Sequence, residues 1–202
     1  MVGVPVKYTA ISITTPYWKP GENYLKQIVN SIRNDLEDRD IVTISEKAIS
    51  TATGNLLDES IVHPGWAARF LTKYWMRLDW GYVLGPLCHL RKRTIQHLRA
   101  YPTREGSTHK QLVLKHAGLL QALMLGSEGG IDASNLPYFY VSLPLRNAQQ
   151  TAERIRERIK SGLGKNVVVM IVDTDKTYSF RGFHFTPRPN AIKGIHSRGG
   201  FI

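Results

Sequence analysis

Residues 126–135, which read GSEGGIDASN, hold the side chains of this chain that are best suited to phosphate and metal chemistry. Three glycines fall within the first five positions, so the backbone can adopt positive φ angles and approach a ligand closely. A carboxylate, a hydroxyl and an amide then follow in quick succession. This composition favours a loop that holds a phosphate and its metal ion.

A second carboxylate follows a predicted strand. Residues 167–172, VVVMIV, form an apolar run typical of a buried strand, and Asp173 and Thr174 come directly after it. Oxygen ligands of this kind suit Mg²⁺ or Mn²⁺. We therefore expect Asp132 and Asp173 to share one divalent cation.

The elements that must position these residues are predicted from hydrophobic spacing and turn residues. They are a strand at 4–13, a helix from Glu22 or Asn23 to about 36, a strand at 41–44, a helix with an aromatic face at 61–84, a break at 81–86, an extended segment at 136–144 and a helix at 146–161. Residues 111–125 fit either a strand or a helix. We expect an α+β protein, with a mixed β-sheet and packed helices.

Four blocks in the same order resemble the coenzyme F-420 γ-glutamyl ligase family. The blocks are residues 16–23 (PYWKPGEN), 40–54 (DIVTISEKAISTATG), 130–135 (GIDASN) and the pair at 173–174, with Ala191 and Ile192 further on. The resemblance implies a γ-glutamyl ligase-like fold and a homodimer. It also implies a GTP- and metal-dependent enzyme that joins a phosphorylated deazaflavin coenzyme to L-glutamate through an acyl phosphate.

The resemblance also implies roles for individual residues. Asp132, Asp173 and Thr174 would hold Mg²⁺ or Mn²⁺. The nucleotide would be contacted by Thr14, Thr15, Pro16, Glu46, Lys47, Thr51 and Asn135. Thr51 stands where the family pattern has a lysine, so Lys47 is expected to take over the phosphate contact; the alternative is a surface lysine paired with Glu46.

The C-terminal part departs from the family pattern, since Asp175 and Lys176 replace its Gly-Arg pair. We expect a divergent, C-terminally shortened member, with a basic, loop-rich tail from about residue 176. Such a chain could bind GTP poorly, use another nucleotide such as ATP, or depend on a partner subunit. The alternative is a non-catalytic relative that binds a nucleotide or polyanion, nucleic acid included, through its basic surface.

The formal net charge of +11 attracts phosphorylated ligands and nucleic acid alike. Residues 89–116 are the most basic part, and we expect a solvated helix face there. The alternative is that Arg91, Arg93 and Arg99, with Arg181 in the tail, receive the phosphate of the coenzyme substrate. Nucleic acid is the less favoured partner, because no zinc-finger spacing or aromatic RNA-binding block accompanies the charge.

Length and hydropathy predict a single domain over residues 1–202. No apolar run approaches the about 18 to 20 residues that a membrane span needs. The sequence also has no signal-peptide pattern at its start. We therefore expect a cytoplasmic protein without a membrane partner.

Overall fold

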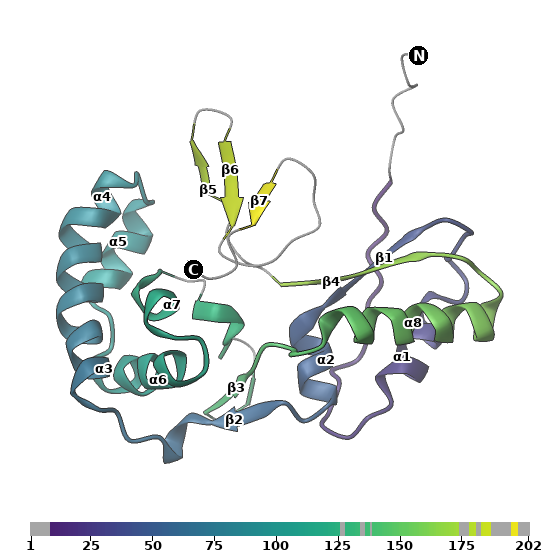
Figure 1. Cartoon of the computed structure of the whole chain (residues 1–202), viewed down its shortest axis with the longest axis horizontal. Helices are drawn as coiled ribbons and strands as arrows, with labels where there is room; N and C mark the ends of the chain where they lie inside the picture. Colours follow the sequence, from purple (N-terminus) through teal and green to yellow (C-terminus); the bar gives the residue numbers. More distant parts are fainter. Residues whose placement is uncertain are drawn as a thin grey trace. The chain divides into compact units, whose positions relative to one another are not determined.

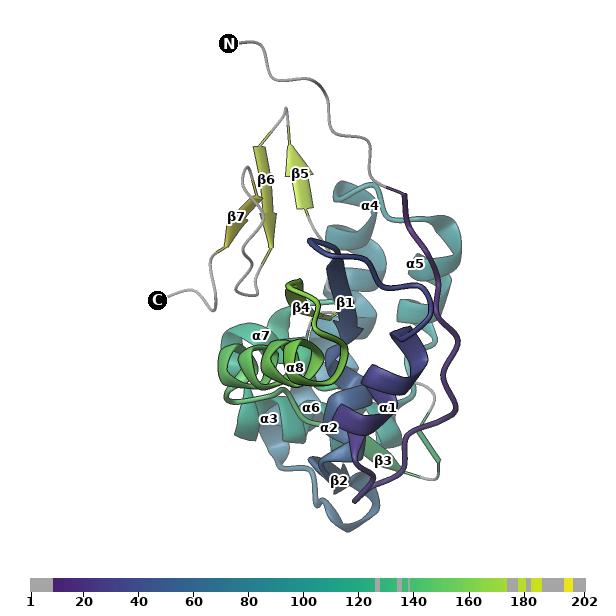
Figure 2. The same ribbon diagram turned by 90° about the vertical axis from the view of Figure 1, so that its right-hand side faces the viewer.

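The computed structural model describes residues 9–125, 128–133, 136–137 and 139–173, together with the backbone of 178–180, 183–186 and 195–197 (Figure 1). Asn135, Thr174 and Arg181 lie outside the described residues. The structure combines helices with small parallel and antiparallel sheets, which confirms the α+β class (Figures 1 and 2). Within the described ranges, no helix combines the length and apolar character needed to cross a membrane.

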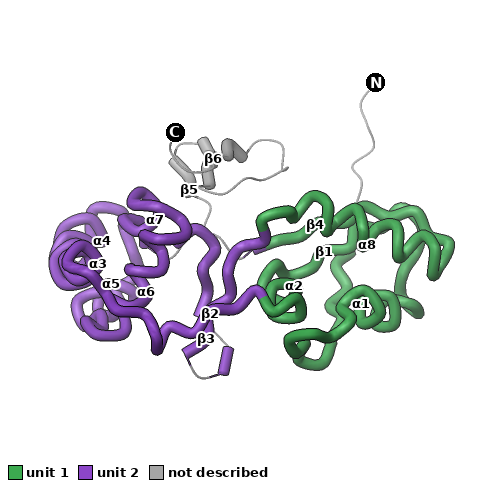
Figure 3. Tube along the Cα trace, turned by 60° about the horizontal axis from the view of Figure 1, so that its bottom comes forward, with its two compact units in different colours: residues 1–54, 146–172 green, residues 55–145, 173–202 purple. Residues whose placement is uncertain are grey.

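The chain divides into two compact units, coloured green and purple in Figure 3. Unit 1 contains Met1–Gly54 and Arg146–Val172, and unit 2 contains Asn55–Leu145 and Asp173–Ile202. Each unit is therefore assembled from two separate stretches of sequence. The single domain predicted over residues 1–202 stays a prediction.

Unit 1 is built on two parallel strands, β1 (Ile41–Ser45) and β4 (Val168–Val172). Alternate residues of β1 are buried, so one face of the pair packs against the interior. Helix α8 (Ala148–Leu163) contacts β4 and helix α1 (Tyr24–Ile32). Their apolar faces form the core, with Ile28, Val29, Ile32, Ile155 and Ile159 buried. Helix α2 (Glu46–Ala52) follows β1 directly.

Caps confirm the predicted start of α1 at Asn23 and the predicted end of α8 at Gly164, whereas α1 ends at Ile32, before the predicted limit of about 36, and α8 begins at Ala148. The side chain of Asn23 accepts a hydrogen bond of 3.0 Å from the Lys26 amide at the start of α1. Gly164 ends α8 in the left-handed conformation, with φ of 69°. The strand predicted at 4–13 is wrong for its described residues, because residues 9–13 have no strand partner and Ile11 is 64% exposed.

Unit 2 is mostly helical. After strand β2 (Leu56–Asp58) and the short turn η1 (Glu59–Ile61), one continuous helix runs through α3 (Trp66–Phe70), η2 (Leu71–Leu84) and α4 (Gly85–Leu87). Helices α5 (Lys92–Arg99), α6 (Thr103–His116) and α7 (Leu119–Leu123) follow, so residues 111–125 are largely helical. The core is made of Leu71, Leu112, Val113, Ala122, Ile131 and Val141.

The middle segment η2 is wound as a π-helix, in which hydrogen bonds join residues five apart. The amide of Gly85, for example, donates to the carbonyl of Trp80, and a Cβ at Gly85 would lie 2.3 Å from that oxygen. The break predicted at 81–86 is therefore wrong: the glycine allows the helix to continue. The wider turn also changes which residues are buried, so the predicted aromatic face is only partly core.

Two further small sheets belong to unit 2. Strand β2 pairs in antiparallel fashion with β3 (Tyr140–Ser142), within the segment predicted to be extended. In the tail, β5 (Tyr178–Phe180), β6 (Phe183–Thr186) and β7 (Ile195–Ser197) form a three-stranded sheet. The tail that we expected to be loop-rich thus contains regular strands.

Candidate functional site

The two parallel strands of unit 1 end side by side. Ser45 at the end of β1 pairs with Val172 at the end of β4, and the chain continues into Glu46 and Asp173 respectively. In sheets of this kind, ligands bind beyond the carboxyl ends of the strands. In the sequence, an acidic residue thus directly follows the end of each strand.

Helix α2 carries three residues predicted to contact a nucleotide. Glu46 is buried and Lys47 is half-buried, and both already have an interaction partner. Thr51 is buried, and its hydroxyl donates a 2.8 Å hydrogen bond to the carbonyl of Lys47. The side chain of Thr51 therefore stabilises the helix, and only its oxygen lone pairs remain for a ligand.

The loop before α1 was predicted to contact the nucleotide through Thr14, Thr15 and Pro16. All three are exposed and lie outside regular structure. In the same loop, the side chain of Trp18 is 6% exposed, and its indole N–H has no hydrogen-bond partner among the described residues. A buried donor without a partner is costly, so this N–H is a donor whose hydrogen bond the described residues do not supply.

The glycine loop of unit 2 has the geometry that the sequence predicts. Gly129 has φ of 67° and Gly130 has φ of 82°, both in the left-handed region. A Cβ at Gly129 would lie 2.3 Å from the Cβ of Ala117, so a side chain is excluded there. Asp132 then forms an isolated bridge with Ser142: its amide donates to the Ser142 carbonyl at 3.2 Å, and the Ser142 amide donates back at 2.9 Å.

A buried cluster of charges holds the start of this loop. Glu128 accepts hydrogen bonds from Nε2 of His109 and, at 2.7 Å, from Nζ of Lys110. The other ring nitrogen of His109, Nδ1, lies 2.6 Å from a carboxylate oxygen of Glu59. Lys110 is fully buried and also donates to the carbonyl of Met124 at 3.3 Å. We call Glu59, His109, Lys110 and Glu128 the charge cluster; it joins η1, α6 and the glycine loop.

The charge cluster shifts the pKa of His109 and of Glu128. Burial alone would lower the pKa of His109, but the hydrogen bonds and charges of Glu128 and Glu59 outweigh it and raise this pKa to about 9. Burial alone would raise the pKa of Glu128, but its bonds and charge interactions with His109 and Lys110 lower it to about 2. Burial, reinforced by the charges of Glu128 and Glu59, raises the pKa of Tyr101. Near neutral pH, His109 is therefore a cation between two carboxylates.

Sequence reasoning missed this cluster. We expected a solvated basic face over residues 89–116, and that prediction is wrong for Lys110, which is fully buried, and for His109, which is only partly exposed. The sequence signal for the burial of Lys110 was its spacing, because Lys110 lies at helical intervals from Gly106 and Val113. In the structure these three residues share the buried face of α6. Glu128 was missed in the same way; its carboxylate connects the glycine loop to His109 and Lys110 of α6.

The predicted metal ligands are both half-buried, and each already takes part in an interaction within the protein. Their carboxylates fit Mg²⁺ or Mn²⁺ by donor type. Across the described part of the chain, no group of three or more histidine, cysteine or acidic side chains forms a ready-made metal site. A metal at Asp132 and Asp173 stays a prediction, and Thr174 lies outside the described residues.

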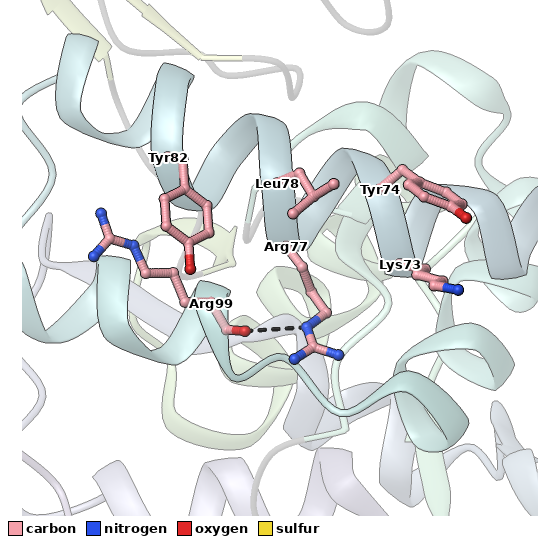
Figure 4. A pocket seen from close by; sticks show the side chains of 6 residues that line it. All are labelled: Lys73, Tyr74, Arg77, Leu78, Tyr82 and Arg99. Carbon is pink, nitrogen blue, oxygen red and sulfur yellow. Dashed lines mark hydrogen bonds between the residues drawn. The ribbon is translucent and has the colours of Figure 1, made fainter.

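The arginines predicted to receive a phosphate lie on or beside α5. Arg91 precedes the helix and Arg93 lies in its first turn, and both are exposed. Arg99, at the end of the helix, lines a surface groove with Lys73, Tyr74, Arg77, Leu78 and Tyr82 (Figure 4). The groove contains about 440 Å³ of empty space, part of it open to solvent.

A comparison with known protein families decides what kind of protein this is. The family model described as F420-0:Gamma-glutamyl ligase matches residues 12–197, which is nearly the whole chain. The chain belongs to the F420-0:gamma-glutamyl ligase family. The resemblance seen in the four sequence blocks is thereby confirmed.

This member of the ligase family is similar to a protein from Methanocaldococcus jannaschii that is described as the uncharacterized protein MJ1361. The two sequences are 44% identical over 191 residues, which cover 93% of this chain. The chain spans 65% of the length of that relative.

Proposed function

We propose that this protein is an amide-bond ligase, dependent on GTP and a divalent metal, that adds L-glutamate to a phosphorylated deazaflavin coenzyme. The γ-phosphoryl group of GTP would pass to the acceptor carboxylate, giving an acyl phosphate, and the glutamate amine would then displace phosphate to form the amide. Membership of the F420-0:gamma-glutamyl ligase family is the observation that carries this proposal.

Two features of the chain support it independently. The parallel strands β1 and β4 of unit 1 end in register at Ser45 and Val172, and ligands bind beyond the carboxyl ends of strands of this kind. In the loop before α1, the buried indole N–H of Trp18 has no hydrogen-bond partner within the described ranges, and Trp18 follows the segment expected to contact the nucleotide. That N–H is a donor for a nucleotide oxygen.

Each residue then has a defined task. Lys47 and Asn135 orient the nucleotide, and Thr14, Thr15 and Pro16 bound its site. Asp132, Asp173 and Thr174 supply oxygen ligands for Mg²⁺ or Mn²⁺. When bound, the metal would neutralise phosphate oxygens during transfer. No side-chain nucleophile is required, because positioning of the reacting groups supplies much of the rate.

Calorimetric titration of GTP, and then of ATP, tests the proposal, with Mn²⁺ present or with a chelator. We expect GTP binding that requires the metal and is lost in Asp132→Asn. The matched control is Asp35→Asn, which removes an exposed charge of unit 1 and should bind normally. Metal-independent binding, or no binding by folded wild-type protein, would overturn the proposal.

A further inference from the structure

The helix through residues 66–87 leaves a row of large apolar side chains in solvent. Tyr74, Leu78 and Tyr82 follow one another at intervals of four residues and are 42%, 50% and 58% exposed. Phe70 continues the row, with its ring centre 5.3 Å from that of Tyr74. A contiguous exposed row of this kind usually marks an interaction surface.

Cationic side chains accompany this row. Lys73 and Arg77 come from the same helix and Arg99 comes from α5, and all three line the groove with Tyr74, Leu78 and Tyr82. Figure 4 shows the three apolar side chains in succession along η2, with the three cationic side chains beside them. We call these six residues the basic-aromatic groove.

The two arginines of the groove are held in place through their Nε atoms. Nε of Arg77 donates to the carbonyl of Arg99 at 3.0 Å, and Nε of Arg99 donates to the carbonyl of Gly81 at 2.9 Å. The guanidinium of Arg99 also lies 4.2 Å from the ring centre of Tyr82. Since each guanidinium has five N–H donors, four per arginine remain for a ligand.

No carboxylate among the described residues forms an ion pair with Lys73, Arg77 or Arg99. Within the part of the chain that the structure describes, the groove thus presents three cations that no carboxylate neutralises, in a chain of net charge +11. A second copy of this chain would bring like charge to this face, which disfavours self-association here. The charge of the groove therefore favours an anionic ligand.

The shape favours a polymer. A small molecule is usually enclosed by its pocket, whereas the aromatic side chains here stay about half exposed and extend beyond the groove to Phe70. Proteins that bind single-stranded nucleic acid combine a basic groove with aromatic side chains on which bases stack. We infer that the basic-aromatic groove binds single-stranded nucleic acid, with phosphates on Lys73, Arg77 and Arg99 and bases on Tyr74 and Tyr82.

Fluorescence anisotropy of labelled oligothymidylate and oligouridylate, about ten nucleotides long, tests this inference. The titrations contain chelator and no nucleoside triphosphate, so the result is independent of the proposed ligase activity. We expect dissociation constants of about 1 to 100 µM, with log K falling against log salt with a slope of about −2 for three phosphate contacts. The two oligonucleotides show whether RNA or DNA is preferred.

Substitutions separate the phosphate contacts of the cationic side chains from the stacking of bases on the tyrosines. Lys73→Gln or Arg77→Gln should reduce the magnitude of the salt slope by about 0.7 each. Tyr74→Leu or Tyr82→Leu should lower affinity by about fivefold or more and leave the slope unchanged. The control is Lys115→Gln, an equal loss of charge on the exposed side of α6, which should leave the slope unchanged. Circular dichroism confirms that each variant is folded.

Three outcomes would overturn the inference. The first is no binding by folded wild-type protein at low salt. The second is equal binding of a blunt duplex with the same number of phosphates, because its bases are not free to stack. The third is equal competition by polyglutamate of matched charge, which would identify the groove as a surface for an acidic protein.

Discussion

The ammonium group of Lys110 lies 2.7 Å from a carboxylate oxygen of Glu128, although the lysine side chain is fully buried. This ion pair connects the middle of α6 to the residue just before Gly129 and Gly130. The glycine loop, which leads to Asp132, is thus anchored to a rigid helix by charge as well as by its backbone. The cluster has consequences for stability that can be measured.

Loss of the Lys110 cation should destabilise the protein strongly. Lys110→Met keeps most of the side-chain volume but removes one of the two cations that Glu128 contacts among the described residues, so we expect the free energy of unfolding to fall by about 3 kcal/mol. Urea denaturation measures this change. The exposed Lys115→Met on the same helix should change stability by less than about 0.5 kcal/mol. Similar values for both variants would contradict the role assigned to the ion pair.

The stability of the protein should depend on pH in a defined direction. The pKa of His109 rises from 6.5 to about 9 on folding, so its contribution is complete below about pH 6.5 and is lost as the pH rises through about 9. The pKa of Glu128 falls from 4.5 to about 2, so its contribution is complete above about pH 4.5 and is lost as the pH falls through about 2. We expect maximal stability between about pH 4.5 and 6.5.

His109→Gln provides the test of the alkaline side. Urea unfolding of this variant should show a flatter decline between about pH 6.5 and 9 than the wild type. His97→Gln, on the exposed face of α5, serves as the control and should keep the wild-type profile. An unchanged decline in His109→Gln would show that another group causes it.

Gly129 should tolerate alanine less well than a glycine of the same backbone conformation. Gly129 and Gly164 have φ of 67° and 69°, but a Cβ would meet Ala117 at Gly129 and nothing within 4 Å at Gly164. We expect Gly164→Ala to cost about 1 kcal/mol and Gly129→Ala about 1 to 3 kcal/mol more, measured by denaturation. Adding Ala117→Gly should recover the excess; no recovery would reject the clash as its cause.

Arg99 should stabilise the π-helical segment through the carbonyl of Gly81. In π-helical hydrogen bonding that carbonyl would pair with the amide of residue 86, and Pro86 has none. We expect Arg99→Leu to lower the free energy of unfolding by about 1 to 2 kcal/mol. In a Pro86→Ala background, which restores an amide donor, the same change should cost less. Equal costs in both backgrounds would exclude this compensation.

Local patterns predicted the elements that rest on local causes. The helix capped by Asn23, the strand at 41–44 and the helix that ends at Gly164 were predictable because spacing, caps and glycine conformation are encoded within a few residues. The positive φ angles at Gly129 and Gly130 were predictable for the same reason. Family membership was also readable, since four short blocks keep their order.

Other features were not visible in the sequence because they depend on partners far along the chain. A buried lysine at position 110 becomes tolerable only when Glu128, on another element, supplies the opposite charge. The buried face of residues 66–87 could not be predicted from hydrophobic spacing, because the wider turn of the π-helix departs from the period of 3.6 residues of an α-helix.

The sequence by itself therefore determined the family, the α+β class and the chemical groups available for binding a ligand, since these follow from residue types and short-range spacing. The tertiary structure alone decided which charges are buried together, which glycines exclude a side chain and which aromatic residues stay in solvent. The physical reason is that burial and electrostatic compensation arise between segments that meet only when the chain has folded.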